Sequence, residues 1–340
     1  MTFYRSLKAK GAALAVAGLM AATSAQAENQ SYILATATTG GTYYPVGVAL
    51  ATLTKVKLEP KQKISMSAIT SAGSGENVKL LRENQAQFAI MQGLYGGWAW
   101  SGTGKVKNDG PQKNLRTVSM LWQNVEHFGI RSEHAKTGTV SDLAMLKGKG
   151  FSIGKKNSGT EGSGRTILGN LGIDVDGTFD VAYMGYGPSG QGFQNGNIDG
   201  FNIPAGPPVS AITATAAAVG SDLTILDFTD EQMAQANGDL KLWTRYVIPA
   251  DTYPGQSKPI NTIAQPNFLA VNEDVPEETV YLITKTIYEN LPFLNAIHKA
   301  TKAMDISKAI AGLPAPLHPG AARYYTEQGI EIPPHLIATN

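Results

Sequence analysis

The sequence predicts an α/β fold of two lobes. Apolar stretches of strand length alternate with amphipathic helical stretches, which is typical of largely parallel sheets covered by helices. This alternation runs through two successive cycles, and strand patterns return in the last third of the chain. Two cycles and a returning segment predict two lobes joined by at least two crossings of the chain. We place lobe 1 at residues 28–125 and 256–340, and lobe 2 at residues 126–255.

The first cycle is a β-α-β-α-β succession. Short apolar runs between turn residues predict strands at 32–38, 64–68 and 88–91. Apolar residues recur at helical spacing from Val46 to about Lys57, and a second helix is expected after the 71–75 loop. Residues 93–114 are rich in Gly, Lys and Trp, and we expect a long surface excursion there.

The second cycle and the C-terminal part show the same alternation. Further strands are expected at 118–122, 128–131, 151–154, 181–184, 223–226, 262–264 and 268–271, and helices at 161–171 and 208–218. The clearest helix begins at Pro276, with two glutamates in its first turn and an apolar stripe behind them. The proline-rich tail, 311–340, is expected to wrap over the surface.

The N-terminal residues predict export. Three basic residues precede an apolar run from Gly11 to Ala22, and Ala25-Gln26-Ala27 has small residues at the two positions that a signal peptidase reads. We therefore expect residues 1–27 to be a cleaved signal peptide and the mature protein to lie in the periplasm. The alternative, a membrane anchor, is disfavoured because the run is too short for a hydrocarbon core of roughly 30 Å.

Composition excludes several classes of protein. Without the signal segment the chain carries 25 basic and 27 acidic residues, a net charge of −2, so we expect no nucleic-acid binding. The chain has no cysteine, which excludes disulfides, thiolate chemistry and cysteine-based metal sites. Its five histidines show no metal-ligand pairing, and no G-x-S-x-G motif offers a nucleophile. We therefore expect no metal, no cofactor and no catalytic residue.

A first candidate binding loop, Thr39-Gly-Gly-Thr-Tyr-Tyr-Pro45, follows the first strand. Its paired glycines allow the backbone to approach a ligand closely, and the helix behind it directs free N–H groups at the loop, which suits an anion. Tyr43 adds a flat apolar face and a hydroxyl. A tight turn with tyrosines packed in the core explains this loop equally well.

Two further loops also precede helices. In Ser71-Ala-Gly-Ser-Gly-Glu-Asn77, a helix N-cap role for Ser74 explains the loop without any ligand. The loop Asn157-Ser-Gly-Thr-Glu-Gly-Ser-Gly164 is similar to a phosphate loop, but no lysine precedes Thr160, which excludes nucleotide hydrolysis. What remains is a helix N-terminus with hydroxyl groups, which suits a carboxylate.

The segment Gly185-Tyr-Gly-Pro-Ser-Gly190 matches the spacing of a dinucleotide-binding fingerprint. We reject that function because Pro188 interrupts the motif and because Gly192 and Gly196 are expected to break up the helix that should follow.

Taken in order, these loops resemble the TAXI-type solute receptors of tripartite ATP-independent periplasmic (TRAP) transporters. The segments that carry the resemblance span nearly the whole mature chain: Thr39–Gly47, Ser71–Asn77, Ala89–Gln92, Leu146–Lys149, Phe151–Gly154, Ser158–Thr160, Gly196–Asp199, Gly206–Pro208 and Asp274–Tyr281.

The resemblance implies the two-lobed type II periplasmic-binding-protein fold, with the ligand cleft between the lobes. It implies a soluble receptor, expected to be a monomer, which captures a small organic acid or amino acid such as glutamate or 2-oxoglutarate. The receptor would deliver this ligand to the TRAP transporter membrane subunit. By position, the implied ligand-binding residues are Thr42, Tyr43, Ser74, Asn77 and Gln92 from lobe 1 and Ser158, Gly159, Thr160 and Gly206 from lobe 2.

Two other functions stay open at this point. A periplasmic sensor or adaptor of the same fold would present its ligand to a receptor, and the sequence does not separate it from a transport protein. An exported hydrolase is the third alternative, although no motif supports it.

Overall fold

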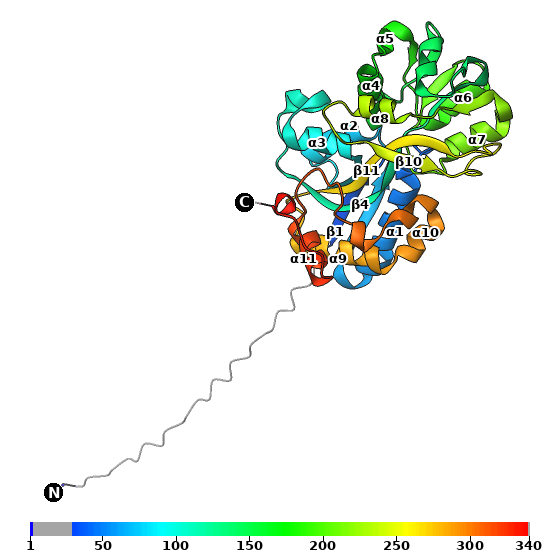
Figure 1. The fold of residues 1–340 in the computed structure, drawn as a ribbon. Helices are drawn as coiled ribbons and strands as arrows, with labels where there is room; N and C mark the ends of the chain where they lie inside the picture. The colour runs from blue at the N-terminus through cyan, green and yellow to red at the C-terminus, as the bar shows by residue number, and fades with distance from the viewer. Residues whose placement is uncertain (3–28, 339–340) are drawn as a thin grey trace.

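The computed structural model describes residues 1–2 and 29–338 of the chain. From position 3 onward, the predicted signal peptide lies outside the described residues. In the described part, strands and helices alternate and form two sheets with helices packed around them (Figure 1). The α/β class predicted from the sequence is confirmed.

The first sheet contains strands from both halves of the chain. Its order is β10-β11-β3-β1-β2, and β4 also pairs with β11. The pairs β1–β2 and β1–β3 are parallel, whereas β11 is antiparallel to its three partners. The six strands are β1 (Gln30–Ala35), β2 (Ile64–Ile69), β3 (Phe88–Gln92), β4 (Leu115–Val125), β10 (Thr244–Ile248) and β11 (Ile260–Asn272).

The second sheet lies wholly in the middle of the chain. Its order is β7-β6-β8-β5-β9, with β6 parallel to β7 and β8, and β5 antiparallel to β8 and β9. The strands are β5 (Phe128–Arg131), β6 (Gly150–Ser152), β7 (Asp180–Ala182), β8 (Gly200–Asn202) and β9 (Leu223–Ile225). We call the parts built on the first and second sheets the first and second lobe.

Helices complete both lobes (Figure 1). The helices of the first lobe are α1 (Tyr43–Gln62), α2 (Ser74–Arg82), α3 (Gly93–Ser101), α9 (Glu277–Glu289), α10 (Leu291–Ile297) and α11 (Pro319–Glu327). Those of the second lobe are α4 (Gly159–Asn170), α5 (Val175–Thr178), α6 (Tyr186–Gln194), α7 (Ser210–Val219) and α8 (Asp230–Asn237). Short 3₁₀ helices are η1 (Gly104–Asp109), η2 (Ser132–His134), η3 (Val140–Leu146), η4 (Gly220–Asp222), η5 (Lys299–Ala303), η6 (Ile306–Lys308) and η7 (Pro334–Leu336).

The chain crosses between the two sheets at two places. Only Glu126 and His127 separate β4, in the first sheet, from β5, in the second. The chain returns between β9, which is in the second sheet, and β10, which is in the first. The second crossing therefore lies before Thr244, the first residue of β10. The return at residue 256 that we expect from the sequence stays a proposal about where the lobes divide.

Residues 93–114 form the expected surface excursion only in part, since most of residues 101–114 are exposed whereas most of residues 93–99 are buried. They fold into α3 and η1, and five of the nine residues of α3 are buried. Leu94 belongs to an apolar cluster of the second lobe, and the Tyr95 ring packs directly on the backbone of α4. A Cβ at Gly162 would lie only 2.4 Å from Cε2 of Tyr95, so the contact requires glycine there. This segment therefore joins the two lobes.

The proline-rich tail is also more than a surface wrap. It contains α11, whose Tyr324 and Tyr325 are buried in the core of the first lobe. The Tyr325 hydroxyl donates a hydrogen bond of 2.9 Å to the carbonyl of Val118, and the N–H of His318 donates one of 2.9 Å to the carbonyl of Thr117. The tail thus completes the first lobe along β4.

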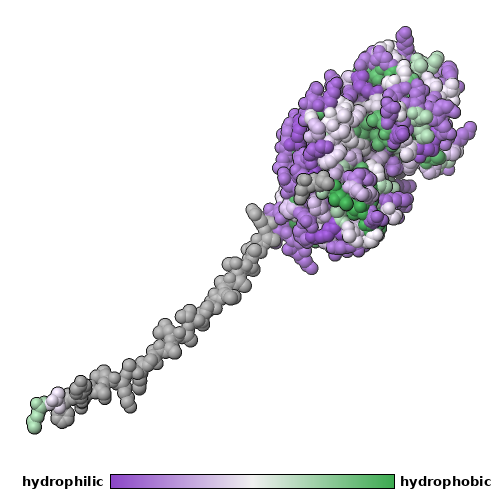
Figure 2. Space-filling model, turned by 60° about the vertical axis from the view of Figure 1, so that its left-hand side comes forward, coloured by the Kyte–Doolittle hydropathy of each residue, from purple (hydrophilic) through white to green (hydrophobic). Residues whose placement is uncertain are grey.

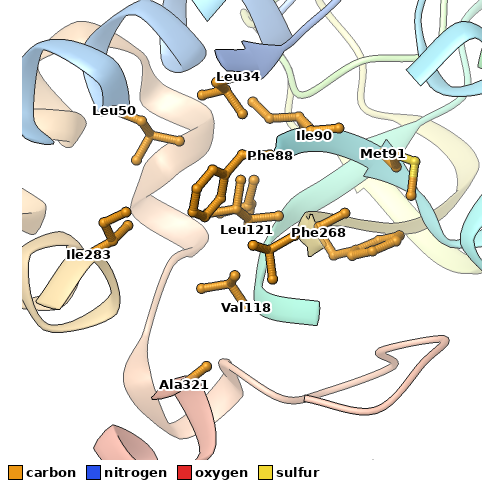
Figure 3. Packing of buried hydrophobic residues seen from close by; sticks show 14 of the residues in the cluster. Leu34, Leu50, Phe88, Ile90, Met91, Val118, Leu121, Phe268, Ile283 and Ala321 are labelled. Carbon is orange, nitrogen blue, oxygen red and sulfur yellow. The ribbon is translucent and has the colours of Figure 1, made fainter. Parts of the chain in front are cut away.

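The main hydrophobic core lies between the first sheet and its helices. Figure 3 shows Phe88 in its centre, with Leu34 and Ile90 on one side and Leu121 and Phe268 on the other. Phe88 is fully buried and meets Tyr32 edge to face, with ring centroids 5.6 Å apart. On the outside, hydrophilic side chains cover most of the face seen in Figure 2, with small hydrophobic patches between them.

Across the described residues, we find no helix with both the length and the apolar character needed to cross a membrane.

We predict that Phe88→Ala lowers the free energy of unfolding by about 3–5 kcal/mol, because it leaves a large cavity in the core. Phe293→Ala, at a position that is 40% exposed on α10, should cost no more than about 1 kcal/mol. Guanidinium unfolding followed by circular dichroism measures both. Equal effects of the two substitutions would contradict the position of the core.

Candidate functional site

Four helices begin around one cavity between the lobes. In the first lobe, α1 and α2 follow β1 and β2; in the second, α4 and α6 follow β6 and β7. The first residues of these helices, Tyr43, Ser74, Gly159 and Tyr186, all line the cavity. Both pairs of strands are parallel, so the helices that follow them start at the same edge of each sheet. The space between the residues that line the cavity, including the part open to solvent, is about 450 Å³.

The electrostatics of these helix starts favour a negative charge in the cavity. The first N–H groups of a helix have no partner within it, and the aligned peptide dipoles put a partial positive charge at this end. Among the residues that the structure describes, no side chain caps the N-terminus of α1, α2 or α6. Only α4 is capped, by the Ser158 hydroxyl, which accepts a 3.0 Å hydrogen bond from the N–H of Glu161. A small anion can therefore bind several free backbone donors here.

A buried amide, Gln92, connects the lobes at the wall of the cavity, and a second amide, Asn124, bonds to it. The Gln92 side chain donates a hydrogen bond of 2.8 Å from Nε2 to the carbonyl of Gly159, across from the first lobe to the second. Its Oε1 accepts a hydrogen bond of 2.9 Å from Nδ2 of Asn124. The Ser74 hydroxyl accepts a 3.1 Å hydrogen bond from the Gln92 N–H, and Gly73, not Ser74, is the N-cap of α2. The structural role expected for Ser74 was therefore wrong.

The tyrosine hydroxyls in the wall also have defined partners. Tyr43 donates its hydroxyl to Oδ1 of Asn267, and Tyr186 donates its hydroxyl to the carbonyl of Pro204 at 2.6 Å. The oxygen of Tyr186 is then free to accept from the Thr160 hydroxyl, 2.7 Å away. Burial raises the pKa of Tyr43 and of Tyr186 well above the usual range, so both phenols stay neutral at physiological pH.

The structure brings most of the predicted site residues together. Those that line the cavity are Thr42, Tyr43, Ser74, Gln92, Ser158, Gly159 and Thr160.

Asn77 and Gly206 do not line the cavity. The Asn77 amide is fully buried and donates to the carbonyls of Thr36 and Ile90, at 2.8 and 2.9 Å. Gly206 accepts a 2.9 Å hydrogen bond from the Thr42 hydroxyl through its carbonyl. Both residues support the wall from behind, so we leave them out of the proposed ligand contacts.

Sequence reasoning missed four polar side chains of the cavity: Thr38, Asn124, Lys155 and Tyr186. Tyr186 lies in the glycine-rich segment where we expected a broken helix, yet α6 runs without interruption to Gln194. Gly190 lets α6 pack on α7, since a Cβ there would lie 2.5 Å from the Thr215 hydroxyl. The position of Tyr186 directly after a predicted strand was the signal that could have found it.

The crossing from β4 to β5 buries two titratable groups beside the site. Glu126 is fully buried; its Oε2 accepts a 3.1 Å hydrogen bond from Asn202, and its Oε1 has no partner among the residues that the structure describes. Burial raises the pKa of Glu126 to about 7, although the hydrogen bond from Asn202 partly opposes this shift.

His127 is neutral at the same crossing, because burial lowers its pKa to about 4. Its Nδ1 donates to the carbonyl of Val125 at 2.8 Å. Nε2 must then accept, and the Tyr253 hydroxyl donates to it at 2.8 Å. This buried network holds the crossing in place.

One group of side chains outside the cavity has the spacing of metal ligands. Ligand atoms of Glu133, His134 and Asp199 lie within 4.8 Å of one another. Nε of Arg131 lies 3.6 Å from Oδ1 of Asp199, so a guanidinium already supplies positive charge there. We therefore base no function on this group.

The fold and the cavity define a class of protein. The arrangement is that of the two-lobed periplasmic binding proteins, as comparison with solved structures shows. The periplasmic binding protein BugD is 12% identical over 88% of this chain and 94% of its own, with a TM-score of 0.53. PhnD1 from Prochlorococcus marinus, solved in complex with methylphosphonate, is 12% identical over 81% of this chain and 91% of its own, with a TM-score of 0.51.

A family model narrows the class. The model of the NMT1-like family matches residues 34–329, and the chain belongs to this family. The likeness to solved structures confirms the predicted two-lobed fold. The resemblance to TAXI-type receptors stays a prediction.

We predict that the stability of the Glu126→Gln variant depends less on pH than the stability of the wild-type protein. Burial raises the pKa of folded Glu126 to about 7, whereas the pKa of an exposed glutamate is 4.5. The folded state therefore binds more protons than the unfolded state between these values, and the contribution of Glu126 to stability falls as the pH rises from 4.5 to 7. The melting temperature of Glu126→Gln relative to wild type should therefore rise between pH 5 and pH 8. Glu331→Gln, at an exposed position, is the control. If the difference in melting temperature between Glu126→Gln and wild type stays constant from pH 5 to pH 8, the prediction is refuted.

Proposed function

We propose that this chain is an extracytoplasmic solute-binding protein that captures a small organic anion between its lobes. The observation that carries this proposal is the convergence of four helix N-termini on one cavity, three of them without a side-chain cap. Backbone N–H groups, hydroxyls and amides around such a cavity are suited to a carboxylate or a similar anion. Membership of the NMT1-like family and the fold support a binding role.

Closure of the lobes on the ligand is the second part of the proposal. Three of the contacts that join the lobes beside the cavity are Gln92 to Gly159, the N–H of Glu76 to the carbonyl of Asn157 at 2.9 Å, and Lys105 to Glu161 at 2.8 Å. All three would break if the lobes moved apart about the crossing at 126–127. A ligand that touches both lobes would favour the closed arrangement by its extra contacts there.

For the partner and the ligand, we propose a TAXI-type receptor of a TRAP transporter, with glutamate or 2-oxoglutarate as ligand. This finer proposal rests on the ordered loop motifs, and the predicted signal peptide supports a periplasmic location. The structure of PhnD1 holds methylphosphonate. A phosphonate is also an anion that suits helix N-termini, so phosphonates belong in the ligand screen.

We predict that at least one small organic acid stabilises the protein in a thermal-shift screen. The panel contains dicarboxylates, keto acids, acidic amino acids and phosphonates, with neutral sugars as the control. A ligand at ~100 times its Kd stabilises by about 2.7 kcal/mol, which corresponds to roughly 5 °C in a protein of this size. If only neutral compounds, or none, shift the melting temperature, capture of an anion is refuted.

We further predict that Tyr43→Ala and Thr160→Ala each weaken binding of the identified ligand by about tenfold or more, because each removes a polar group from the wall. The matched control is Thr166→Ala on the same helix as Thr160; its hydroxyl bonds to the carbonyl of Gly162, and it does not line the cavity. Isothermal titration calorimetry measures the Kd, and circular dichroism checks folding. Normal binding by both variants would mean that the ligand lies elsewhere.

A further inference from the structure

Lys155 is the one charged side chain among the described residues that line the cavity. It lies in the loop between β6 and α4, three residues after the end of β6. Its side chain runs along Gly185, where a Cβ would lie 3.7 Å from Cε of the lysine. All other side chains of the cavity wall are neutral, so this lysine sets the formal charge of the lining.

The position of Lys155 is at the mouth of the cavity. An open groove adjoins the cavity, and both share Thr38, Ala72, Lys155 and Gly185 in their walls. Gln92, only 1% exposed, lines the cavity and not the groove, so it forms part of the inner wall. Lys155 therefore lies where the cavity meets the groove.

The ammonium group of Lys155 has no anionic partner in the described part of the chain. Two other basic side chains of this region are paired: Lys105 with Glu161 at 2.8 Å, and Arg165 with Asp176 at 2.9 Å. Lys155, in contrast, forms no ion pair with any residue that the structure describes. A lysine is a mobile point charge on a flexible stem, and at the edge of a polar cavity its field is less screened than on an open surface.

We propose that Lys155 is a specificity-determining residue that selects organic dianions over monoanions of the same length. One acidic group of the ligand binds the helix N-termini at the inner wall, and the second binds the ammonium group at the mouth. Lys155 has this role only if the proposed function, capture of an organic anion in this cavity, holds. The lysine then adds charge recognition to a site that otherwise recognises anions through backbone N–H groups.

The test compares ligands that differ in a single acidic group. The pairs are 2-oxoglutarate with 2-oxovalerate, and glutarate with valerate, in which a methyl group replaces one carboxylate. Calorimetry gives the Kd of each ligand for the purified protein, freed of bound ligand by unfolding and refolding. The variants are Lys155→Met and the control Lys156→Met. Lys156 lies 4.9 Å from the ring centroid of Tyr183 and does not line the cavity.

The wild-type protein should bind the dianion of at least one pair about tenfold more tightly than the monoanion, the size expected for one charge-assisted contact. Lys155→Met should reduce this preference to less than about threefold while it keeps the monoanion Kd within about threefold. Lys156→Met should behave like wild type. Methionine keeps the length of the side chain at an exposed position, so folding should be unaffected.

Distinct outcomes separate the two proposals. If wild type binds monoanions and dianions equally, or if Lys155→Met keeps the preference, the role of Lys155 is overturned while anion capture stands. Equal losses in Lys155→Met and Lys156→Met would also overturn it, since general surface charge would then explain the effect. If no organic acid binds the wild-type protein at all, the proposed function itself fails.

Discussion

The start of four helices in one small volume is the constraint on which the rest of the site depends. Parallel strands end at a common edge, so the helices that follow them begin there, and their unpaired N–H groups face the space between the lobes. Close approach of the loops requires small residues. A Cβ at Gly75 would lie 2.4 Å from the carbonyl oxygen of Asn157, and one at Gly159 would lie 2.8 Å from Cδ of Gln92. The glycines of these loops thus let the two lobes meet around the cavity.

Polar groups buried between the lobes explain how the crossing keeps its geometry. Gln265 and Asn267 on β11 are fully buried; Gln265 accepts the N–H of Leu94 at 2.8 Å, and Asn267 accepts the hydroxyl of Tyr43. With Glu126 and His127 beside them, these side chains connect β11 to the first residues of α1 and α3. These hydrogen bonds offset part of the cost of burying polar side chains, while Glu126 Oε1, Gln265 Nε2 and Asn267 Nδ2 have no partner among the described residues. Movement of the lobes and protonation of Glu126 would therefore both affect the crossing at residues 126–127.

Local sequence patterns predicted the positions of helices and strands well, but they predicted poorly what these segments pack against. The helix after Pro276 and the strands at 64–68 and 88–91 lie where their periodicity placed them, because period and turn residues are properties of short segments. Residues 93–114 were misjudged in part. Gly and Trp there suggested a solvent-exposed segment, whereas Leu94 and Tyr95 pack against the second lobe, on residues far away in the sequence. The tail was misjudged for the same reason, since Tyr325 bonds to Val118, 207 positions earlier.

By itself, the sequence determined the α/β class and the positions of the loops that precede helices. From these loops and the resemblance, it also predicted seven of the residues that line the cavity. Only the tertiary structure decided which polar side chains enter that cavity. Asn77 turned out to bond to the backbone behind the wall, whereas Asn124 and Lys155 are part of the wall. The physical reason is distance along the chain: Gln92 and Gly159 are 67 residues apart, yet they share one hydrogen bond. No local pattern reports such a contact, and the chemistry of the cavity depends on it.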